Sequence, residues 1–207
     1  MKLMLVRHGE TASNLKMTLD SVPPGPPLTD LGQEQANRLA EALADEPVVA
    51  VYASTAVRAQ QTAAPVAARH GLAVQVVEGV QEIFCGDLEG RSDRESYGVF
   101  VKTAAAWAEG DLDLTLPGGE NGRQVVDRCT GTIAKITEGV AEGTVVLVSH
   151  GGAIRLTGQA LAPNVTSGMA ATGLLPNTGR VVLESDGDAW RCVAWSGVDI
   201  PSDRPLG

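Results

Sequence analysis

The amino-acid sequence predicts an α/β protein, a three-layer sandwich with a mainly parallel central sheet and helices on both faces. Apolar runs of strand length alternate along the chain with segments in which apolar residues recur at helical spacing. Two of the runs, residues 3–6 and 144–148, lead into a histidine followed by glycine, as expected where strands of an open sheet end at a binding site. Asp186-Gly187, between two alternating segments, predicts a hairpin that adds antiparallel strands at an edge.

Length and composition are those of an ordinary soluble globular protein, with 207 residues, 43% hydrophobic and 20% charged. No internal repeat or linker divides the chain, so we expect one domain over residues 1–207. No run approaches the ~20 apolar residues that cross a membrane. Only four apolar residues lie between Lys2 and Arg7, too few for the core of a secretory signal, and we therefore expect a cytoplasmic protein.

Charge and cysteine content narrow the range of partners. A formal net charge of -9 opposes non-specific binding to nucleic acid or to acidic membranes. The chain has only 3% aromatic residues, which argues against base-stacking surfaces, so the expected partner is a small molecule. The cysteines Cys85, Cys129 and Cys192 are odd in number and widely separated, which predicts buried free thiols rather than disulfides or a zinc site.

The first predicted strand is followed by an irregular stretch over residues 14–27. Its proline-rich part, residues 21–27, is either a plain connector or a rim over His8. A helix begins at Thr29 or Asp30, where Gln33 is placed to complete a pair resembling a capping box. The predicted buried stripe of this helix consists of Leu31, Ala36, Leu39, Ala40 and Leu43.

Three further signals define the next part of the chain. The continuous apolar run over residues 48–52 predicts a buried strand. A helix that opens at Arg58 extends to about residue 70, with Gly71 as its carboxyl-terminal cap and Pro65 expected to kink it. Residues 73–77 predict a third strand.

Two longer helices follow, separated by a polar loop that contains residues 117–119. Ser92 and Glu95 form a capping box at the start of the first helix, which ends at Gly110. Its predicted core stripe consists of Val99, Phe100, Thr103, Ala104 and Trp107. The predicted buried face of the second helix consists of Val125, Val126, Cys129, Ile133 and Ile136.

The last third of the chain contains the most apolar strand, residues 144–148, and then a helix rich in small residues that begins near Gly152. The amino terminus of this helix would offer backbone N–H donors to an anion. The irregular residues 163–178 are expected to form the opposite rim of the site. Residues 180–185 and 190–195 form the predicted hairpin.

Several polar residues are candidates for chemistry. His8, at the end of a strand, would be accessible to a ligand yet rigidly held, and His150 repeats this arrangement. The helix dipole disfavours Arg58 in a first turn, so this side chain is either an ordinary surface group or one directed at a phosphate. Composition alone leaves the role of general acid open among the carboxyl groups that follow the third strand, Glu82, Asp87 and Glu89.

Four motifs occur in order across nearly the whole chain. They are Arg7-His8-Gly9-Glu10-Thr11; Ser54 and Arg58 with Gln61-Thr62-Ala63; Glu82 with Gly86 and Glu89-Gly90; and Val148-Ser149-His150-Gly151. Together these motifs resemble the histidine phosphatase superfamily, also called phosphoglycerate-mutase-like.

The resemblance implies that His8 attacks phosphorus and becomes a phosphohistidine. It also implies that Arg7, Arg58 and His150 bind the phosphoryl oxygens. Glu82 would protonate the leaving alcohol and then help to activate the water that releases phosphate. These roles agree with the chemistry, because a neutral imidazole is a good nucleophile and phosphoryl transfer depends on positioning and charge stabilisation.

The resemblance further implies that Asn14 lies near the phosphate, that Gly151 belongs to the substrate site, and that Glu10 supports the first loop by hydrogen bonding. It implies no metal and no cofactor. A metal site is also disfavoured by the residues themselves, since Arg7 and Arg58 would repel a cation and no His-Glu-x-x-His spacing occurs.

Within this superfamily, cofactor-dependent mutases carry basic and tyrosine residues soon after the acidic residue, whereas residues 83–85 here are Ile-Phe-Cys. This departure favours a phosphatase for a small phosphorylated metabolite, with Phe84 lining the site for the rest of the substrate. A mutase with Arg91 or Arg94 as a second anion clamp is one alternative, and a non-catalytic phosphate-binding module is another. A homodimer stays open, since family members often pair.

Overall fold

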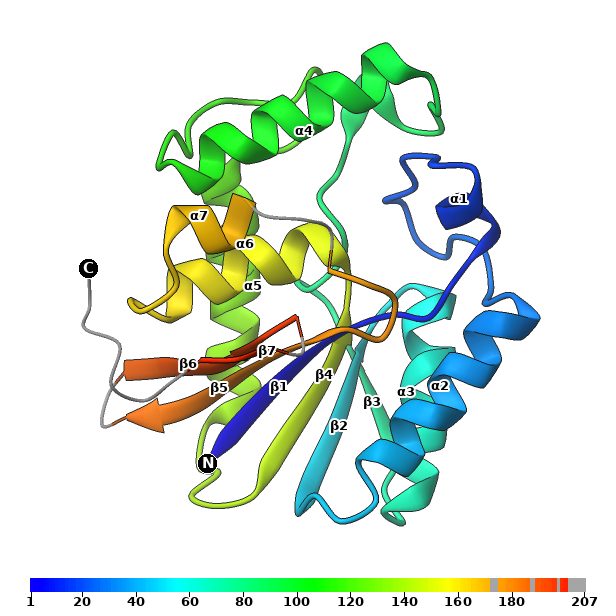
Figure 1. Cartoon of the computed structure of the whole chain (residues 1–207), viewed down its shortest axis with the longest axis vertical. Helices are drawn as coiled ribbons and strands as arrows, with labels where there is room; N and C mark the ends of the chain where they lie inside the picture. The colour runs from blue at the N-terminus through cyan, green and yellow to red at the C-terminus, as the bar shows by residue number, and fades with distance from the viewer. Residues whose placement is uncertain (172–174, 187–188, 197, 201–207) are drawn as a thin grey trace.

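The structure, a computed structural model, describes residues 1–171, 175–186, 189–196 and 198–200. Its centre is a seven-stranded sheet in the order β3-β2-β4-β1-β5-β6-β7 (Figure 1). The strands are β1 (Lys2–Arg7), β2 (Val48–Ser54), β3 (Val74–Val77), β4 (Thr144–Ser149), β5 (Arg180–Asp186), β6 (Ala189–Trp195) and β7 (Val198–Asp199). The helices are α1 (Ala12–Leu15), α2 (Asp30–Ala42), α3 (Val57–Arg69), the 3-10 helix η1 (Gly86–Leu88), α4 (Arg94–Ala108), α5 (Gly122–Thr137), α6 (Gly151–Leu161) and α7 (Ser167–Ala171).

The predicted α/β fold class is confirmed. Strands β1 to β4 are mutually parallel, and β5, β6 and β7 extend the sheet in antiparallel fashion beyond β1. The predicted hairpin is therefore present as β5 and β6, while its turn, residues 187–188, lies outside the described residues. In the register of β1 with β4, Arg7 pairs with Ser149, so the residues after both strands emerge side by side.

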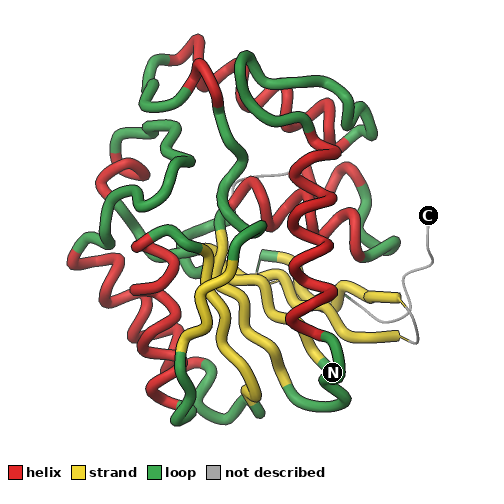
Figure 2. Tube along the Cα trace, turned by 180° about the vertical axis from the view of Figure 1, so that it is seen from behind, coloured by secondary structure: helices red, strands yellow, loops and turns green. Residues whose placement is uncertain are grey.

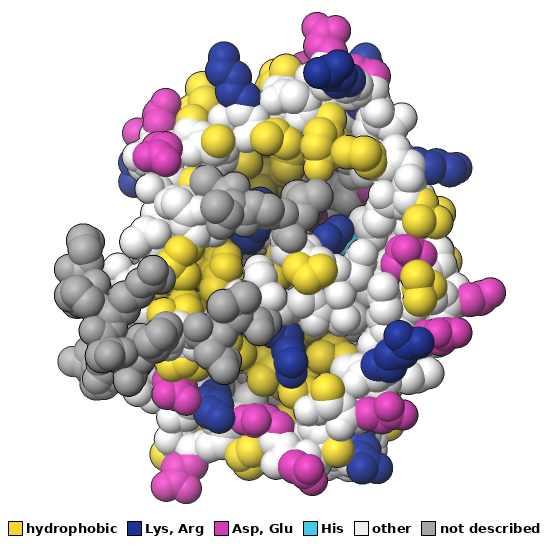
Figure 3. Space-filling view, viewed as in Figure 1, with side chains coloured by type: hydrophobic (Ala, Val, Ile, Leu, Met, Phe, Trp, Pro, Cys, Tyr) yellow, Lys and Arg dark blue, Asp and Glu magenta, His cyan; other side chains and the backbone are white. Residues whose placement is uncertain are grey.

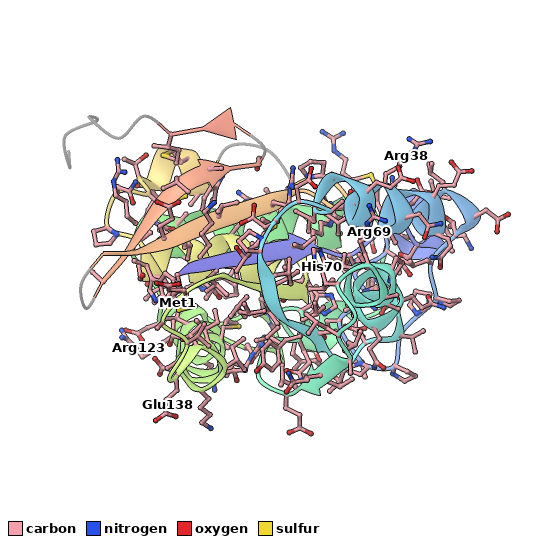
Figure 4. The ribbon with its side chains drawn as sticks, turned by 90° about the horizontal axis from the view of Figure 1, so that it is seen from below. Met1, Arg38, Arg69, His70, Arg123 and Glu138 are labelled. Carbon is pink, nitrogen blue, oxygen red and sulfur yellow. The ribbon has the colours of Figure 1, made fainter. Side chains whose placement is uncertain are left out.

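Helices cover both faces of the sheet, and alternate residues of β1 show how. Leu3 and Leu5 belong to one core cluster with side chains of α5 and α6, whereas Met4 and Val6 belong to another with side chains of α2 and α3. Figure 2 shows the strands between these two layers. From below, the labelled Arg38 of α2 and Arg123 of α5 lie on opposite sides of the strands (Figure 4). The period-two alternation of a strand thus builds two cores at once.

Helix α2 differs from its prediction at the amino-terminal end. Thr29 is the N-cap and accepts a hydrogen bond from the backbone N–H of Gly32, but Gln33 does not complete a capping box. Leu31 was expected in the buried stripe and is 44% exposed. The position one helical turn before Ala36 is Gly32, which is buried in its place.

Helix α4 begins one residue later than a cap at Ser92 would place it. Asp93 is the N-cap, and its carboxylate accepts hydrogen bonds from both the backbone N–H and the hydroxyl of Ser96. Val99 is 37% exposed although it was expected in the core stripe, whereas Trp107 is fully buried. The buried stripe of α4 therefore runs through Ser96, Phe100, Thr103 and Trp107, and Phe100 rather than Val99 faces the core.

Two local features of the chain were expected and one was not. Helix α3 continues across Pro65 and is followed by Gly71 at a φ of +67°, a left-handed conformation that favours glycine. All three cysteines are free and buried, as predicted. The unexpected element is the short helix α1, which Thr11 caps and whose last two residues overlap the stretch 14–27 predicted to be irregular.

None of the described helices has the length and apolar character that a membrane span requires. The interpretation of the chain as one domain over residues 1–207 stays a prediction.

Candidate active site

A pocket of about 300 Å³ opens at the carboxyl ends of β1 and β4, between the loop that follows β1 and helices α4 and α6. In the space-filling view it is seen as a hollow below a group of apolar side chains, with basic and histidine atoms visible inside it (Figure 3). Six of the seven predicted site residues line it. They are Arg7, His8, Asn14, Arg58, Glu82 and Gly151. The sheet topology thus brings together side chains from distant parts of the chain.

His8 lies at the inner end of this pocket and is only 4% exposed. Its Nδ1 is 2.7 Å from the carbonyl oxygen of Gly9, which can only accept a hydrogen bond, so Nδ1 carries the proton. Its Nε2 accepts a hydrogen bond of 3.2 Å from Nε of Arg58. The one acceptor lone pair of the ring is therefore on Nε2, where it accepts the hydrogen bond from Arg58.

The environment of His8 keeps the imidazole neutral. Burial and, to a smaller extent, the positive charges of Arg58 and Arg7 lower the pKa of His8 to about 3, and the hydrogen bond to Gly9 acts in the opposite direction. A buried imidazole next to two guanidinium groups loses its proton readily, because protonation would add a third positive charge in a region with little water. His8 is accordingly in its nucleophilic form at neutral pH.

Arg58 lies in the first turn of α3 and is buried, which excludes the surface alternative for this residue. Its Nη2 donates 2.9 Å to the carbonyl oxygen of Asp20, and its Nη1 is 3.7 Å from the Asp20 carboxylate. Gly25, at a φ of +63°, packs so closely that a Cβ there would lie 2.2 Å from Nη1. Residues 21–27 are absent from the pocket lining, and the loop instead holds Arg58 in place.

Arg7 is the last residue of β1, and its guanidinium group reaches the pocket beside α6. Nη1 donates to the carbonyl oxygen of Leu175, and a Cβ at Gly151 would lie 3.4 Å from Nε of Arg7. Nε itself is buried and has no hydrogen-bond partner among the described residues. Burial lowers the pKa of Arg7, and the charge of Glu82 acts against this effect.

Glu82 is held at the amino terminus of α6. Its Oε2 accepts from the backbone N–H of Gly152 at 3.2 Å, and its Oε1 accepts from Ala153 at 2.9 Å and from Ile83 at 3.0 Å. A carboxylate is favoured at this end of a helix by the unpaired N–H groups and the helix dipole. The side chain is thereby fixed beside the pocket rather than free to rotate.

The structure also separates the three candidate acids. Glu89 accepts hydrogen bonds from the backbone N–H and hydroxyl of Ser21, and so anchors the proline-rich loop. Asp87 is exposed and lies against Gly118. Of the three carboxyl groups, Glu82 is the one that lines the pocket.

Neighbouring residues fix the loop that carries His8. The backbone N–H of Gly9 donates 3.0 Å to Thr62, and Glu10 accepts 2.8 Å from the hydroxyl of Thr29, as expected for a supporting residue. Asn14 lines the pocket, and its Oδ1 accepts from Asn177 at 3.1 Å. Asn177 also donates 3.0 Å to the carbonyl oxygen of His8. Asn177 lies in a stretch predicted to be irregular, where no sequence motif indicated its contact with His8.

His150 is completely buried and lies against His8, with the ring centroids 5.3 Å apart and the rings inclined by 60°. Its Nε2 is 2.8 Å from the hydroxyl of Ser54, and its Nδ1 has no partner among the described residues. Burial lowers the pKa of His150 well below 6.5. Unlike the other predicted site residues, His150 is behind the pocket lining, so it reaches the pocket only through its neighbours.

The outer part of the pocket differs from the expectation for Phe84 and lacks the arginines of the mutase alternative. Phe84 is 44% exposed and is absent from the lining, and its backbone N–H donates to the carboxylate of Glu120. Arg91 forms an exposed ion pair with Asp93 and is also absent from the lining, as is Arg94. The aromatic lining comes from α4 instead, and a further arginine comes from α6. These residues are Tyr97, Phe100, Trp107 and Arg155.

The described residues contain no group of three or more histidine, cysteine, aspartate or glutamate side chains arranged to hold a metal ion. The cationic groups of Arg7 and Arg58 make this pocket suited to an anion. Planar guanidinium groups are well matched to phosphoryl oxygens.

Comparison with known proteins assigns the family. A sequence model of the histidine phosphatase superfamily (branch 1) matches residues 3–197. The chain belongs to this superfamily. The resemblance found in the sequence motifs is thereby confirmed.

Two relatives match nearly the whole of this chain but different shares of their own length. The chain is 31% identical over 205 residues to the metal-independent phosphoserine phosphatase of Arabidopsis thaliana, covering 95% of this chain and 82% of that protein. It is 33% identical over 218 residues to PE-PGRS family protein PE_PGRS11 of Mycobacterium tuberculosis, covering 97% of this chain but only 37% of that protein.

Solved structures of the superfamily have the same fold. A mycobacterial glucosyl-3-phosphoglycerate phosphatase with VO3 superposes with a TM-score of 0.82 at 27% identity, over 95% of this chain and 98% of that chain. The predictions of a phosphoglycerate-mutase-like fold and of a phosphatase-type hydrolase are confirmed.

The lowered pKa of His8 leads to a prediction for stability. The unfolded chain binds a proton at this residue near pH 6.5, whereas the native protein binds it only near pH 3, so unfolding takes up a proton between these values. The free energy of unfolding should therefore fall as the pH is lowered through this window. When the pH is lowered from 7 to 5, the free energy of unfolding, measured by urea titration, should fall by about 2 kcal/mol more in wild type than in His8→Asn. Equal losses in the two proteins would contradict a neutral native His8.

Proposed function

We propose that the chain hydrolyses phosphomonoesters of small metabolites through a phosphohistidine intermediate on His8. The observation that carries this proposal is the state of the His8 ring. Nδ1 is held as a donor by Gly9, and the Nε2 lone pair lies at the pocket beside Arg58. A neutral, oriented imidazole next to cations has the properties of a nucleophile for a phosphate ester.

In the first step, Nε2 of His8 forms a bond to phosphorus as the ester P–O bond breaks. The guanidinium groups of Arg7 and Arg58 bind the phosphoryl oxygens and stabilise their charge. Glu82, as a carboxylic acid, gives its proton to the departing oxygen, so an alcohol leaves. In the second step, the Glu82 carboxylate takes a proton from water, whose oxygen attacks phosphorus, and the P–N bond breaks to release phosphate and neutral His8.

His150 contributes to this site from beneath. Its contact with the His8 ring and its hydrogen bond with Ser54 fix the position of the nucleophile. We assign to its Nδ1, which has no partner among the described residues, the donation of a hydrogen bond to a phosphoryl oxygen in the first step. Asn14 and the backbone of Gly151 complete the binding site.

Phosphatase rather than mutase activity is supported by two considerations. Relatives of the chain include a phosphoserine phosphatase and a glucosyl-3-phosphoglycerate phosphatase, which favours small phosphorylated metabolites as substrates. The residues proposed as a second clamp for a mutase, Arg91 and Arg94, are exposed and absent from the pocket lining. We also propose that the protein is located in the cytoplasm. A homodimer stays a prediction, and so does the lack of binding to nucleic acid or to membranes.

The proposed function is tested by phosphate release from a panel of monoesters in the presence of EDTA. We expect metal-independent hydrolysis, and its loss by about three orders of magnitude or more in His8→Asn, because the nucleophile is removed. His70→Asn is the matched control, since His70 lies outside the pocket lining and should retain wild-type rates.

Interconversion of 3-phosphoglycerate is followed in the same samples. Rapid interconversion with little hydrolysis would establish the mutase alternative. A folded wild type without turnover of any ester would establish a phosphate-binding module.

The role of Glu82 leads to a prediction that depends on the leaving group. Glu82→Gln should lower kcat for the hydrolysis of an alkyl phosphate by about 10²–10⁴-fold, because the departing alcohol needs a proton. The same variant should slow the phosphorylation step with 4-nitrophenyl phosphate far less, because nitrophenolate leaves without a proton. Single-turnover kinetics with both esters measure the difference, with Asp87→Asn as control. An equal loss on both esters would contradict general-acid catalysis by Glu82.

A further inference from the structure

The pocket continues beyond the His8 end along one face of helix α6. Gly151, Arg155 and Gln159 all line it, and they are spaced four residues apart. Four residues of an α-helix span about 6 Å and return to the same face. Arg155 therefore lies about one helical turn outward from Gly151, whose backbone adjoins the Arg7 guanidinium. This face of α6 connects the phosphate end of the pocket with its outer part.

Arg155 has a charge that no described residue neutralises by an ion pair, whereas Arg58 has Asp20 within 4 Å. Its Nη2 donates to the carbonyl oxygen of Ala170, and its Nε is buried without a hydrogen-bond partner among the residues that the structure describes. Burial lowers the pKa of Arg155, and weaker effects of Glu82 and Tyr97 act in the opposite direction. A half-buried guanidinium without a counterion is costly, so a residue of this kind in a pocket indicates an anionic ligand group.

The other side chains of α4 and α6 that line this pocket are mainly apolar or aromatic, with Tyr97 and Gln159 as polar groups. Phe100 and Trp107 of α4 and Leu156 of α6 are among them, and Leu175 also lines the pocket. The group bound there must therefore combine an apolar skeleton with one negative charge. A second phosphate would carry about −1.5 to −2 charges at pH 7, more than one guanidinium balances, whereas a carboxylate carries one.

We propose that Arg155 binds a carboxylate on the alcohol part of the substrate. The preferred substrates are then phosphomonoesters of apolar or aromatic alcohols that bear a carboxylate about one helical turn from the phosphate. The planar fork of a guanidinium matches a carboxylate with two parallel hydrogen bonds, which also orients the ester toward His8. This proposal rests on the proposed function, because its ligand is the substrate of that reaction. The carboxylate site itself can be tested by binding alone.

Two phosphonates that cannot be hydrolysed test it, benzylphosphonate and 3-carboxybenzylphosphonate. Calorimetry should give a Kd about tenfold lower for the carboxylated compound in wild type, from a hydrogen bond between charged groups. Arg155→Gln should bring the two Kd values together. Arg38→Gln removes the same charge from the exposed face of α2 and should keep the tenfold ratio.

Equal Kd values in wild type would overturn the proposal, and so would a ratio that Arg155→Gln leaves unchanged. A further comparison needs no variant, because 3-carbamoylbenzylphosphonate has the same shape without the charge. It should bind wild type like benzylphosphonate, and binding as tight as the carboxylated compound would also overturn the proposal. Phosphate release from phenyl phosphate is measured separately. Selective binding without hydrolysis would contradict the proposed phosphatase function and leave the carboxylate site supported.

Discussion

The contact between the His8 imidazole and the Arg58 guanidinium is the interaction on which the site depends. Nε of Arg58 donates to Nε2 of His8 at 3.2 Å, and both side chains are less than 5% exposed. Two such groups can lie together only when the imidazole is neutral, because a protonated ring would face a fixed positive charge without water. The same charge attracts a phosphate group. One arrangement therefore keeps the nucleophile unprotonated and binds the anion that it attacks.

The fold maintains this contact by topology. β1 and β4 are adjacent and parallel, so the loops that carry His8 and His150 leave the sheet at one edge. Helix α3 follows β2 and brings Arg58 to the same edge, where the proline-rich loop covers it. Helix α6 follows β4 directly, and its free N–H groups hold Glu82. Each of these functional side chains is thus positioned by a strand end or a helix start.

Much of this could be predicted from the sequence, because strand runs, helix caps and the four motifs are local. The limits of local reasoning appear at particular residues. Leu31 was misplaced by one position, since periodicity alone does not show which residue of a first turn meets the sheet. Phe84 lies outside the pocket lining, and its backbone N–H donates to Glu120, which is 36 residues away. Arg155 and Asn177 had no motif, because only the packing of α6 brings Arg155 to the pocket and only the packing of the chain after Pro176 brings Asn177 to the carbonyl oxygen of His8.

The proposed mechanism requires that Nε2, and not Nδ1, of His8 attacks phosphorus. The most direct test is to quench the enzyme in base during turnover of a phosphate ester and examine it by ³¹P NMR. We expect a phosphohistidine resonance typical of the Nε2 isomer, absent in His8→Asn. A resonance of the Nδ1 isomer would contradict the hydrogen bond from Nδ1 to Gly9 as the basis of the mechanism.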